Sequence, residues 1–137
     1  HLYRILLRRN NVQTIHQLSK KDLTAFYAIL DYLDQHMEEE IILADLLEIC
    51  HLSYSNFAVK FRRMTGKNLT DYLCGIRMQK AMHLLATTEL SITAIAGQCG
   101  FPDLCYFSRI FKRTTGLTAN QYRKAVKNHS KPPLQEI

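Results

Sequence analysis

The sequence reads FAVKFRRMTG at residues 57–66 and FSRIFKRTTG at residues 107–116. Five of these ten positions are identical, and Tyr72 and Tyr122 follow the two copies at the same distance. Each copy carries two phenylalanines at positions i and i+4, basic residues beside them and a final glycine. This pattern is typical of an amphipathic helix with a basic outer surface. One structural unit is therefore built twice, and two such helices indicate two contacts with one long polyanion.

The length and composition fit a single domain or two very small ones, because 137 residues with 47% hydrophobic content can form a compact core. The sequence has no run of about eighteen apolar residues that would predict a membrane span. It therefore predicts a soluble, cytoplasmic protein, or a fragment of one, without a membrane partner.

The cysteines and histidines do not have the spacing of a metal or redox site. No CxxC or CxxH pair occurs, so small buried hydrophobes in a reducing cytoplasm are expected at Cys50, Cys74, Cys99 and Cys105. The histidines stand singly, so structural or surface roles are expected for His1, His16, His36, His51, His83 and His129. The sequence predicts no metal and no cofactor.

The charge is divided unevenly along the chain. Residues 19–52 contain two lysines and eight acidic residues, whereas residues 53–127 contain twelve basic and three acidic residues. The basic charge begins where the first repeated helix begins. Because it falls on the repeated units, we favour a phosphate backbone as the partner over a surface that is basic for solubility alone.

Helical periodicity runs through the sequence, since apolar residues recur every three or four positions and no stretch alternates for long. The fold class is predicted as all α, with about seven helices. These are expected near residues 19–37, 43–50, 54–65, 69–86, 92–96, 103–115 and 118–127. A further short helix and a linker are predicted within residues 1–18, and a flexible tail over residues 128–137.

The predicted helix ends carry capping residues. Ser19, Ser53 and Ser91 stand at N-cap positions, while Gly66 and Gly116 end the repeated helices because glycine readily adopts the left-handed conformation. Capping boxes are expected at Ser19 with Asp22 and at Thr118 with Gln121. The first long helix is expected to bury one face, formed by Leu23, Phe26, Tyr27, Leu30, Leu33 and Met37.

A short helix, a tight turn and a second helix occur twice, which is the helix-turn-helix arrangement. In the later copy Ala96 is small where two helices cross, and Gly100 suits the turn. Leu47 and His51 take these places in the earlier copy. Neither residue is small or at ease with a positive φ, so the earlier copy alone is the weaker match.

The chain resembles the DNA-binding domain of the AraC/XylS family of bacterial transcription regulators over residues 20–127. The resemblance is carried by the segment IAGQCGFPDLCYFSRIFKRTTG at residues 95–116 and by Arg77, Ala81, Leu84, Leu85, Gln121, Tyr122 and Arg123. It implies two helix-turn-helix subdomains, at residues 19–67 and 87–127, joined by a rigid helix at residues 69–86. Each subdomain would present one recognition helix to adjacent major-groove segments of one duplex. A connecting helix of eighteen residues spans ~27 Å, so a modest bend in the DNA would bring grooves ~34 Å apart within reach.

In the first recognition helix, Phe57, Phe61 and Met64 are expected to face the core. The resemblance implies base contacts by Ser55, Ala58 and Val59. These side chains suit a thymine methyl group but not a bidentate contact with guanine. Lys60 either reaches DNA or lies along the core with its ammonium at the surface, and we favour the second interpretation.

In the second recognition helix, the core-facing residues are expected to be Tyr106, Phe107, Ile110 and Phe111. The resemblance implies that Leu104, Cys105 and Arg109 face the groove. Arg109 is the strongest candidate for reading a base, because its planar guanidinium can grip guanine through two acceptors. The alternative for Arg109 is a salt bridge to Asp103.

Phosphate contacts position a protein on DNA without reading sequence. The residues expected to make them are Ser53, Lys60, Arg62, Arg63, Arg77, Lys112 and Arg113.

No catalytic constellation is evident, so the chain is predicted not to be an enzyme. Some proteins that resemble this family carry an alkyl-accepting cysteine, but that role is not expected for the four cysteines of this chain, since none has an adjacent lysine or arginine. The remaining alternative to DNA binding is a helical module whose basic surface docks an acidic protein.

The resemblance also implies a larger regulator. It implies sequence-specific binding to double-stranded promoter DNA and activation through RNA polymerase. Residues 1–18 are expected to be the end of a preceding effector or dimerisation domain plus a linker. A small-molecule effector would act only through that domain.

Overall fold

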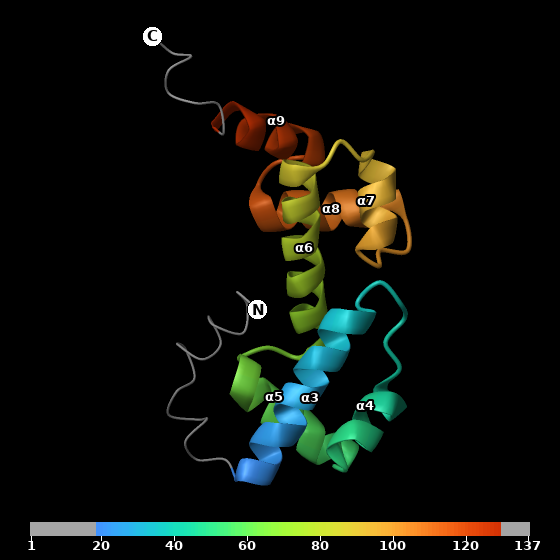
Figure 1. Ribbon diagram of the computed structural model, residues 1–137, viewed down its shortest axis with the longest axis vertical. Coiled ribbons are helices and arrows are strands. Elements are labelled where there is room, and N and C mark those ends of the chain that lie inside the picture. Colours follow the sequence, from blue (N-terminus) through green and yellow to red (C-terminus); the bar gives the residue numbers. More distant parts are fainter. Residues whose placement is uncertain (1–18, 130–137) are drawn as a thin grey trace. The chain divides into compact units, whose positions relative to one another are not determined.

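The computed structural model describes residues 19–129, and this part of the chain is entirely helical (Figure 1). The all-α prediction is therefore confirmed. Predictions for residues 1–18 and 130–137 lie outside the described residues. The seven helices are α3 (Lys20–His36), α4 (Leu43–Cys50), α5 (Tyr54–Thr65), α6 (Leu69–Thr87), α7 (Ile92–Gln98), α8 (Leu104–Thr115) and α9 (Ala119–His129).

The predicted N-caps are present. The hydroxyl oxygens of Ser19, Ser53 and Ser91 each accept a hydrogen bond from the backbone N–H three residues later, at 3.1 to 3.3 Å. The second capping box is reciprocal, because Thr118 accepts from the N–H of Gln121 while Gln121 accepts from the N–H of Thr118. Local chemistry thus determines where these helices begin.

Helix α9 continues to His129, two residues beyond its predicted end. The ammonium of Lys127 forms an ion pair with Glu89, and this pairing lowers the pKa of the Glu89 carboxyl. The contact joins the last turn of α9 to the segment after α6.

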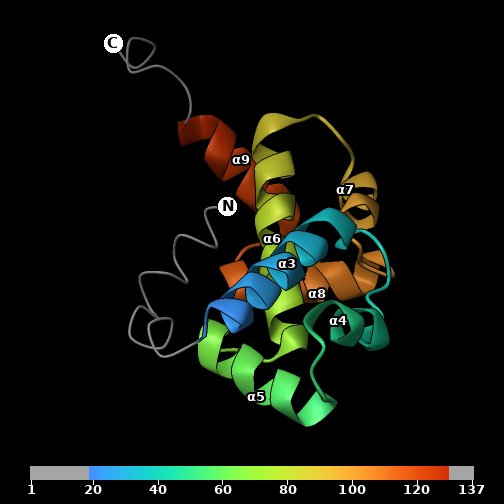
Figure 2. The same cartoon turned by 60° about the horizontal axis from the view of Figure 1, so that its bottom comes forward.

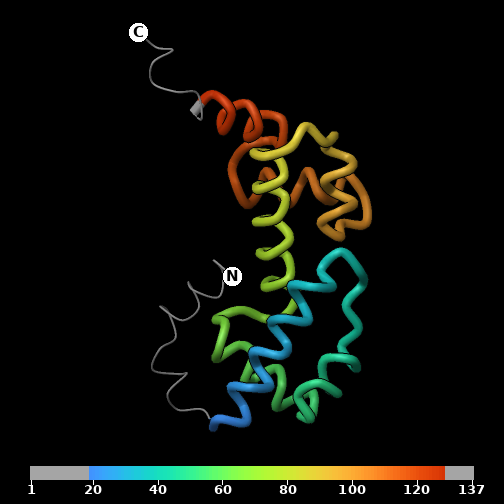
Figure 3. The backbone as a smooth tube through the Cα atoms, viewed as in Figure 1, coloured from blue at the N-terminus to red at the C-terminus, as the bar shows by residue number. Residues whose placement is uncertain are grey.

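The chain divides into two compact units, residues 1–76 and residues 77–137. The division falls inside α6, so each unit includes part of that helix, and Figure 3 follows the backbone through it. Within the described residues, no helix is both long enough and apolar enough to cross a membrane.

In the first unit α3 packs against α4, and α5 completes the core (Figure 2). Of the face predicted for α3, Leu30 and Leu33 are buried and the other positions are half-buried, while Ile29 is buried as well. The core cluster consists of Ile29, Leu30, Leu33, Leu46, Cys50, Phe57, Phe61, Tyr72, Leu73 and Ile76.

In the second unit α7, α8 and α9 surround the later part of α6. The guanidinium of Arg123 donates to the carbonyl oxygens of Leu85, at 3.2 Å, and Thr88, at 3.3 Å. These carbonyls lie at the C-terminal end of α6, where backbone acceptors lack helical partners. Arg123 therefore fastens α9 to the end of α6, a structural role that the sequence did not reveal.

Candidate nucleic-acid interface

The turn that precedes the recognition helix differs between the two helix-turn-helix units. His51 follows α4 with φ of 57°, and Gly100 follows α7 with φ of 83°. The positive φ that appeared unsuited to His51 is adopted there, and the His51 N–H donates to the carbonyl of Leu47 at 2.8 Å. Counted from the residue of positive φ to the N-cap, the second turn is one residue longer, because Pro102 precedes the Asp103 cap. The earlier unit thus keeps the helix-turn-helix geometry at the cost of a strained residue.

The two recognition helices, α5 and α8, end in the same way. Gly66 and Gly116 have φ of 76° and 81°. Just before them, the hydroxyl oxygens of Thr65 and Thr115 each lie 2.8 Å from the carbonyl oxygen four residues earlier, and each accepts the N–H two residues later at 3.1 Å. Identical residues therefore form identical terminal loops.

Aromatic pairs anchor both recognition helices. The rings of Phe61 and Tyr72 meet edge to face with centroids 5.3 Å apart, and those of Phe111 and Tyr122 do so at 5.5 Å. Each tyrosine comes from the helix that follows its recognition helix. The repeated tyrosine in the sequence therefore corresponds to a repeated tertiary contact.

The three positions of α5 that are expected to contact bases carry small or apolar side chains on its outer face. Ser55, Ala58 and Val59 are exposed, while Phe57, Phe61 and Met64 are buried. Tyr54 is 60% exposed and Val59 is 56% exposed. The sequence reasoning did not assign Tyr54 to the site.

Lys60 has a partner inside the first unit. Its Nζ lies 3.1 Å from Oδ2 of Asp22 at the start of α3, and its stem lines a small apolar cavity with Phe26 and Phe57. The Lys60 ammonium lowers the pKa of the Asp22 carboxyl, because it donates a hydrogen bond to the charged form of that group. This geometry agrees with the interpretation that the stem lies along the core.

The outer face of α8 carries the predicted groove residues. Leu104 is 41% exposed, and Cys105 and Arg109 are also exposed. Asp103 uses Oδ1 to accept the backbone N–H of Tyr106 at 2.6 Å, and no acidic side chain among the described residues forms an ion pair with Arg109. The alternative salt bridge between Asp103 and Arg109 is therefore not formed. The burial expected of all four cysteines is wrong for Cys105, which is exposed, whereas Cys50 and Cys99 are buried and Cys74 is half-buried.

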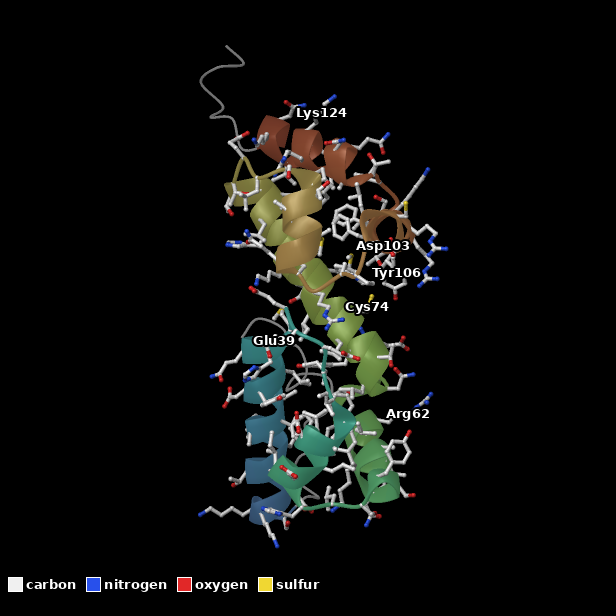
Figure 4. The ribbon with its side chains drawn as sticks, turned by 90° about the vertical axis from the view of Figure 1, so that its right-hand side faces the viewer. Glu39, Arg62, Cys74, Asp103, Tyr106 and Lys124 are labelled. Atoms are coloured by element: carbon white, nitrogen blue, oxygen red, sulfur yellow. The ribbon has the colours of Figure 1, made fainter. Side chains whose placement is uncertain are left out.

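The inward orientation expected for Tyr106 is wrong. Phe107, Ile110 and Phe111 are buried, but Tyr106 is 36% exposed and lies beside Asp103 at the start of α8 (Figure 4). At 100° per residue, Tyr106 stands about 90° from the centre of the buried arc. Its ring therefore lies at the edge of the core, within 5.9 Å of Cζ of Arg109.

A hollow accompanies each recognition helix. The hollow beside α5 has a volume of 390 Å³, and the hollow beside α8 has a volume of 640 Å³. Each is bounded by the start of the preceding helix, the outer face of the recognition helix and the start of the following helix. The following helices contribute Asn68, Thr70, Thr118 and Asn120. Sequence reasoning missed these four residues as site residues, although Thr118 was expected in a capping box.

The hollows differ in charge. Arg62 lines the first, whereas Arg109, Lys112 and Arg113 line the second. Arg62 points outward from α5 (Figure 4), and Arg63 is also exposed. The Ser53 hydroxyl is occupied as the cap of α5.

Arg77, also predicted as a phosphate contact, is half-buried on α6 and is absent from the described lining of both hollows. Among the described residues, no group of three histidine, cysteine or acidic side chains could hold a metal ion. Of the predicted site residues, Ala58 and Arg62 line the hollow beside α5, and Leu104, Arg109, Lys112 and Arg113 line the hollow beside α8.

The comparisons with known proteins agree with this architecture. A sequence model for a helix-turn-helix domain matches residues 46–125, more than half of the chain. The HTH-type transcriptional activator RhaR of Yersinia pseudotuberculosis is 32% identical over 120 residues, which cover 88% of this chain and 41% of RhaR. The chain spans about a third to a half of the length of the first curated relatives that it matches.

Two solved structures are similar over most of the described residues. The C-terminal domain of the two-component response regulator yesN from Fusobacterium nucleatum is 36% identical, with a TM-score of 0.67, covering 73% of this chain and 98% of that domain. The DNA-binding domain of AdpA, solved in complex with a target DNA, is 26% identical, with a TM-score of 0.71, covering 76% of this chain and 94% of that one. The chain belongs to the AraC/XylS family of helix-turn-helix transcription regulators.

Proposed function

We propose that the chain binds double-stranded promoter DNA in a sequence-specific manner, with α5 and α8 in adjacent major-groove segments, and so regulates transcription. The observation that carries the proposal is the repeated exposed helix face, each copy bordered by a hollow that the next helix completes. A helix of this kind fits the major groove, and flanking groups can meet the phosphates on either side.

Base reading divides unequally between the two helices. Arg109 is the residue proposed to grip a guanine, with Leu104 and Cys105 beside it on the exposed face of α8. Ser55, Ala58 and Val59 offer α5 only short polar and apolar contacts, such as those made with thymine methyl groups. We therefore expect the half-site of α8 to be the more sharply defined.

Phosphate binding is assigned to residues around the hollows. Arg62, Arg63, Lys112 and Arg113 supply positive charge at the ends of α5 and α8. The starts of α6 and α9 add backbone N–H groups and the polar side chains of Asn68, Thr70, Thr118 and Asn120. Ser53 and Arg77 remain candidates on the strength of the family resemblance. Lys60 is left out because Asp22 holds its ammonium.

The proposal extends to the whole regulator. Residues 19–67 and 87–127 are assigned to the two subdomains, with residues 69–86 as the connecting helix. Residues 1–18 are assigned to the end of an effector or dimerisation domain that would bind the small-molecule effector. The tail predicted over residues 128–137 is assigned only to the part that follows α9. The name of RhaR as a transcriptional activator supports activation, and recruitment of RNA polymerase in the cytoplasm is the corresponding mechanism.

Selection from a pool of random duplexes tests the proposal. The purified chain is used at two salt concentrations, beside Arg109→Ala and Arg113→Ala. We expect a motif in two halves about one helical turn apart. Arg109→Ala should blur one half and lose roughly 1–3 kcal/mol of discrimination at one base pair. Arg113→Ala should weaken binding to all duplexes alike and reduce the salt slope by about 0.9.

Two results would reject the proposal. Salt-sensitive binding that enriches no motif would reduce the interaction to electrostatic attraction. Absence of DNA binding at low salt would favour the alternative, a helical module that docks an acidic protein.

A further inference from the structure

We propose that Tyr106 is a positioning residue for Arg109. Its ring restricts the Arg109 side chain, before DNA binds, to the conformation that contacts the base pair. This inference rests on the proposed function of α8, because it concerns how one base contact is prepared. It gives Tyr106 a role in discriminating between base pairs and not in packing the hydrophobic core.

The geometry joins the two side chains directly. Cζ of Arg109 lies 5.9 Å from the centroid of the Tyr106 ring, within the range of a cation–π interaction. The residues are three apart on α8, so their side chains are neighbours on the helix surface. Both are exposed, which places the pair where DNA can reach it.

The core supports the Tyr106 ring from below. Its centroid lies 6.0 Å from that of Phe101, which is only 7% exposed. Phe101 in turn meets the fully buried Phe107 edge to face at 5.1 Å. A series of aromatic contacts therefore runs from the core to the surface and ends under the guanidinium. A ring anchored in this way is a stable platform for a flexible side chain.

The nearest acidic residue does not compete for Arg109. The carboxylate of Asp103 accepts the backbone N–H of Tyr106 at 2.6 Å and thereby caps α8. The Asp103 carboxylate is therefore engaged in capping the helix at the residue that also carries the ring. Arg109 therefore has no acidic partner among the described residues, and its guanidinium lies beside the tyrosine ring.

The first unit lacks every member of this arrangement. Leu52 stands at the place of Phe101, Asn56 at that of Tyr106 and Val59 at that of Arg109. Phe101, Tyr106 and Arg109 occur together in the second unit, and the first unit has neither an aromatic nor a cationic side chain at the three matching positions. This joint difference is expected if the three side chains serve one purpose, whereas a core role for Tyr106 would not link it to Arg109.

The physical benefit is preorganisation. A long arginine side chain loses rotamer freedom when it binds, and a partner that already restricts it reduces this loss. Cation–π contacts at exposed sites are weak, so the expected effect is roughly a two- to fivefold change in base discrimination. Because no phosphate contact is removed, the salt dependence of binding should not change.

The test uses Tyr106→Leu, Tyr106→Phe, Arg109→Ala and the double variant Tyr106→Leu with Arg109→Ala. Affinities are measured for the selected duplex and for a duplex changed at the base pair that Arg109→Ala blurs. Tyr106→Leu should lose discrimination there, Tyr106→Phe should retain it, and Tyr106→Leu should add nothing in the Arg109→Ala background. The matched control is a duplex changed in the other half of the motif, where Tyr106→Leu should show the discrimination of the wild type.

Two binding outcomes would overturn the inference. An equal loss in Tyr106→Phe would assign the effect to the hydroxyl group. An undiminished loss in the double variant would mean that Tyr106 acts on DNA without Arg109. Thermal unfolding of each variant shows whether α8 itself is disturbed.

A second readout needs no DNA. In the unbound protein the ring current of residue 106 should shift the side-chain resonances of Arg109 in wild type and in Tyr106→Phe, but not in Tyr106→Leu. Identical resonances in all three would overturn the inference even if the wild type binds a specific motif. A wild type without any sequence preference would overturn the proposed function, and the positioning role with it, whatever the resonances show.

Discussion

The first and second helix-turn-helix units use the same residues to end their recognition helices and different residues to present them. Thr65 and Thr115 form the same contacts before glycines of similar φ. On the outer faces, however, Val59 in the first unit takes the place of Arg109 in the second. The comparison teaches that the repeat preserves the frame of each unit and leaves its surface chemistry open to change.

The two units also differ in how tightly they hold their cations. Lys60 of the first unit is paired with Asp22, whereas Arg109 of the second rests on a ring and has no acidic partner among the described residues. In the first unit a basic side chain is thus used in an ion pair within the protein. The second keeps three basic side chains around its hollow. We infer that α8 contributes more of the sequence readout than α5.

The largest expected effect concerns one buried phenylalanine in each recognition helix, and it tests whether the two units depend equally on that residue for stability. Phe61 and Phe111 are 2% and 0% exposed, and each contacts the tyrosine of the next helix. Replacing either by alanine should lower the free energy of unfolding by about 3–5 kcal/mol, because a large buried ring leaves a cavity. Chemical denaturation measures the loss, and hydrogen exchange shows which unit opens. A cost below about 1 kcal/mol for one variant alone would break the equivalence.

A smaller effect is expected at the two turns. Gly100→Ala forces an alanine into a φ of 83° and should cost about 1–2 kcal/mol. His51→Gly relieves the same kind of strain at φ of 57° and should add up to about 1 kcal/mol. Thermal unfolding of both variants gives the two signs. A destabilising His51→Gly would mean that the imidazole makes a contact worth more than the strain that it imposes.

The smallest effect concerns the ion pair of the first unit. Asp22→Asn should steepen the salt dependence of DNA binding by about 0.9, because the released Lys60 ammonium can then meet a phosphate. Lys60→Met in the wild-type background should leave the slope unchanged. A shallower slope in Lys60→Met would show that Lys60 already contacts DNA and would contradict its assignment to Asp22.

The same pair has a defined pH dependence. Lys60 lowers the pKa of Asp22 below its ordinary value of 3.8. The stabilisation is therefore complete above that value and is lost as the pH falls through the lowered pKa. Both side chains are partly exposed, so the contribution should be at most about 1 kcal/mol. The difference in unfolding free energy between wild type and Asp22→Asn, followed from pH 6 down to pH 2, should shrink below about pH 4.

Much of the fold could be predicted from the sequence because its signals are local. Serine N-caps, terminal glycines and the spacing of phenylalanines each act within one or two turns of a helix. The buried residues of α5 follow from that spacing, as do the exposed Ser55, Ala58 and Val59. The ion pair of Lys127 with Glu89 could not be predicted, because it joins positions that are far apart in the sequence.

The sequence alone determined that this chain is helical, duplicated and basic on its repeated helices, since each of these properties follows from residue types at short spacing. Tertiary structure decided which partners the long side chains choose. In the folded chain Lys60 forms an ion pair with Asp22, and Arg123 donates a hydrogen bond at the end of α6. The exposed ring of Tyr106 lies beside the guanidinium of Arg109. Flexible side chains can reach several neighbours, and only the packing of separate helices determines which neighbour lies within range.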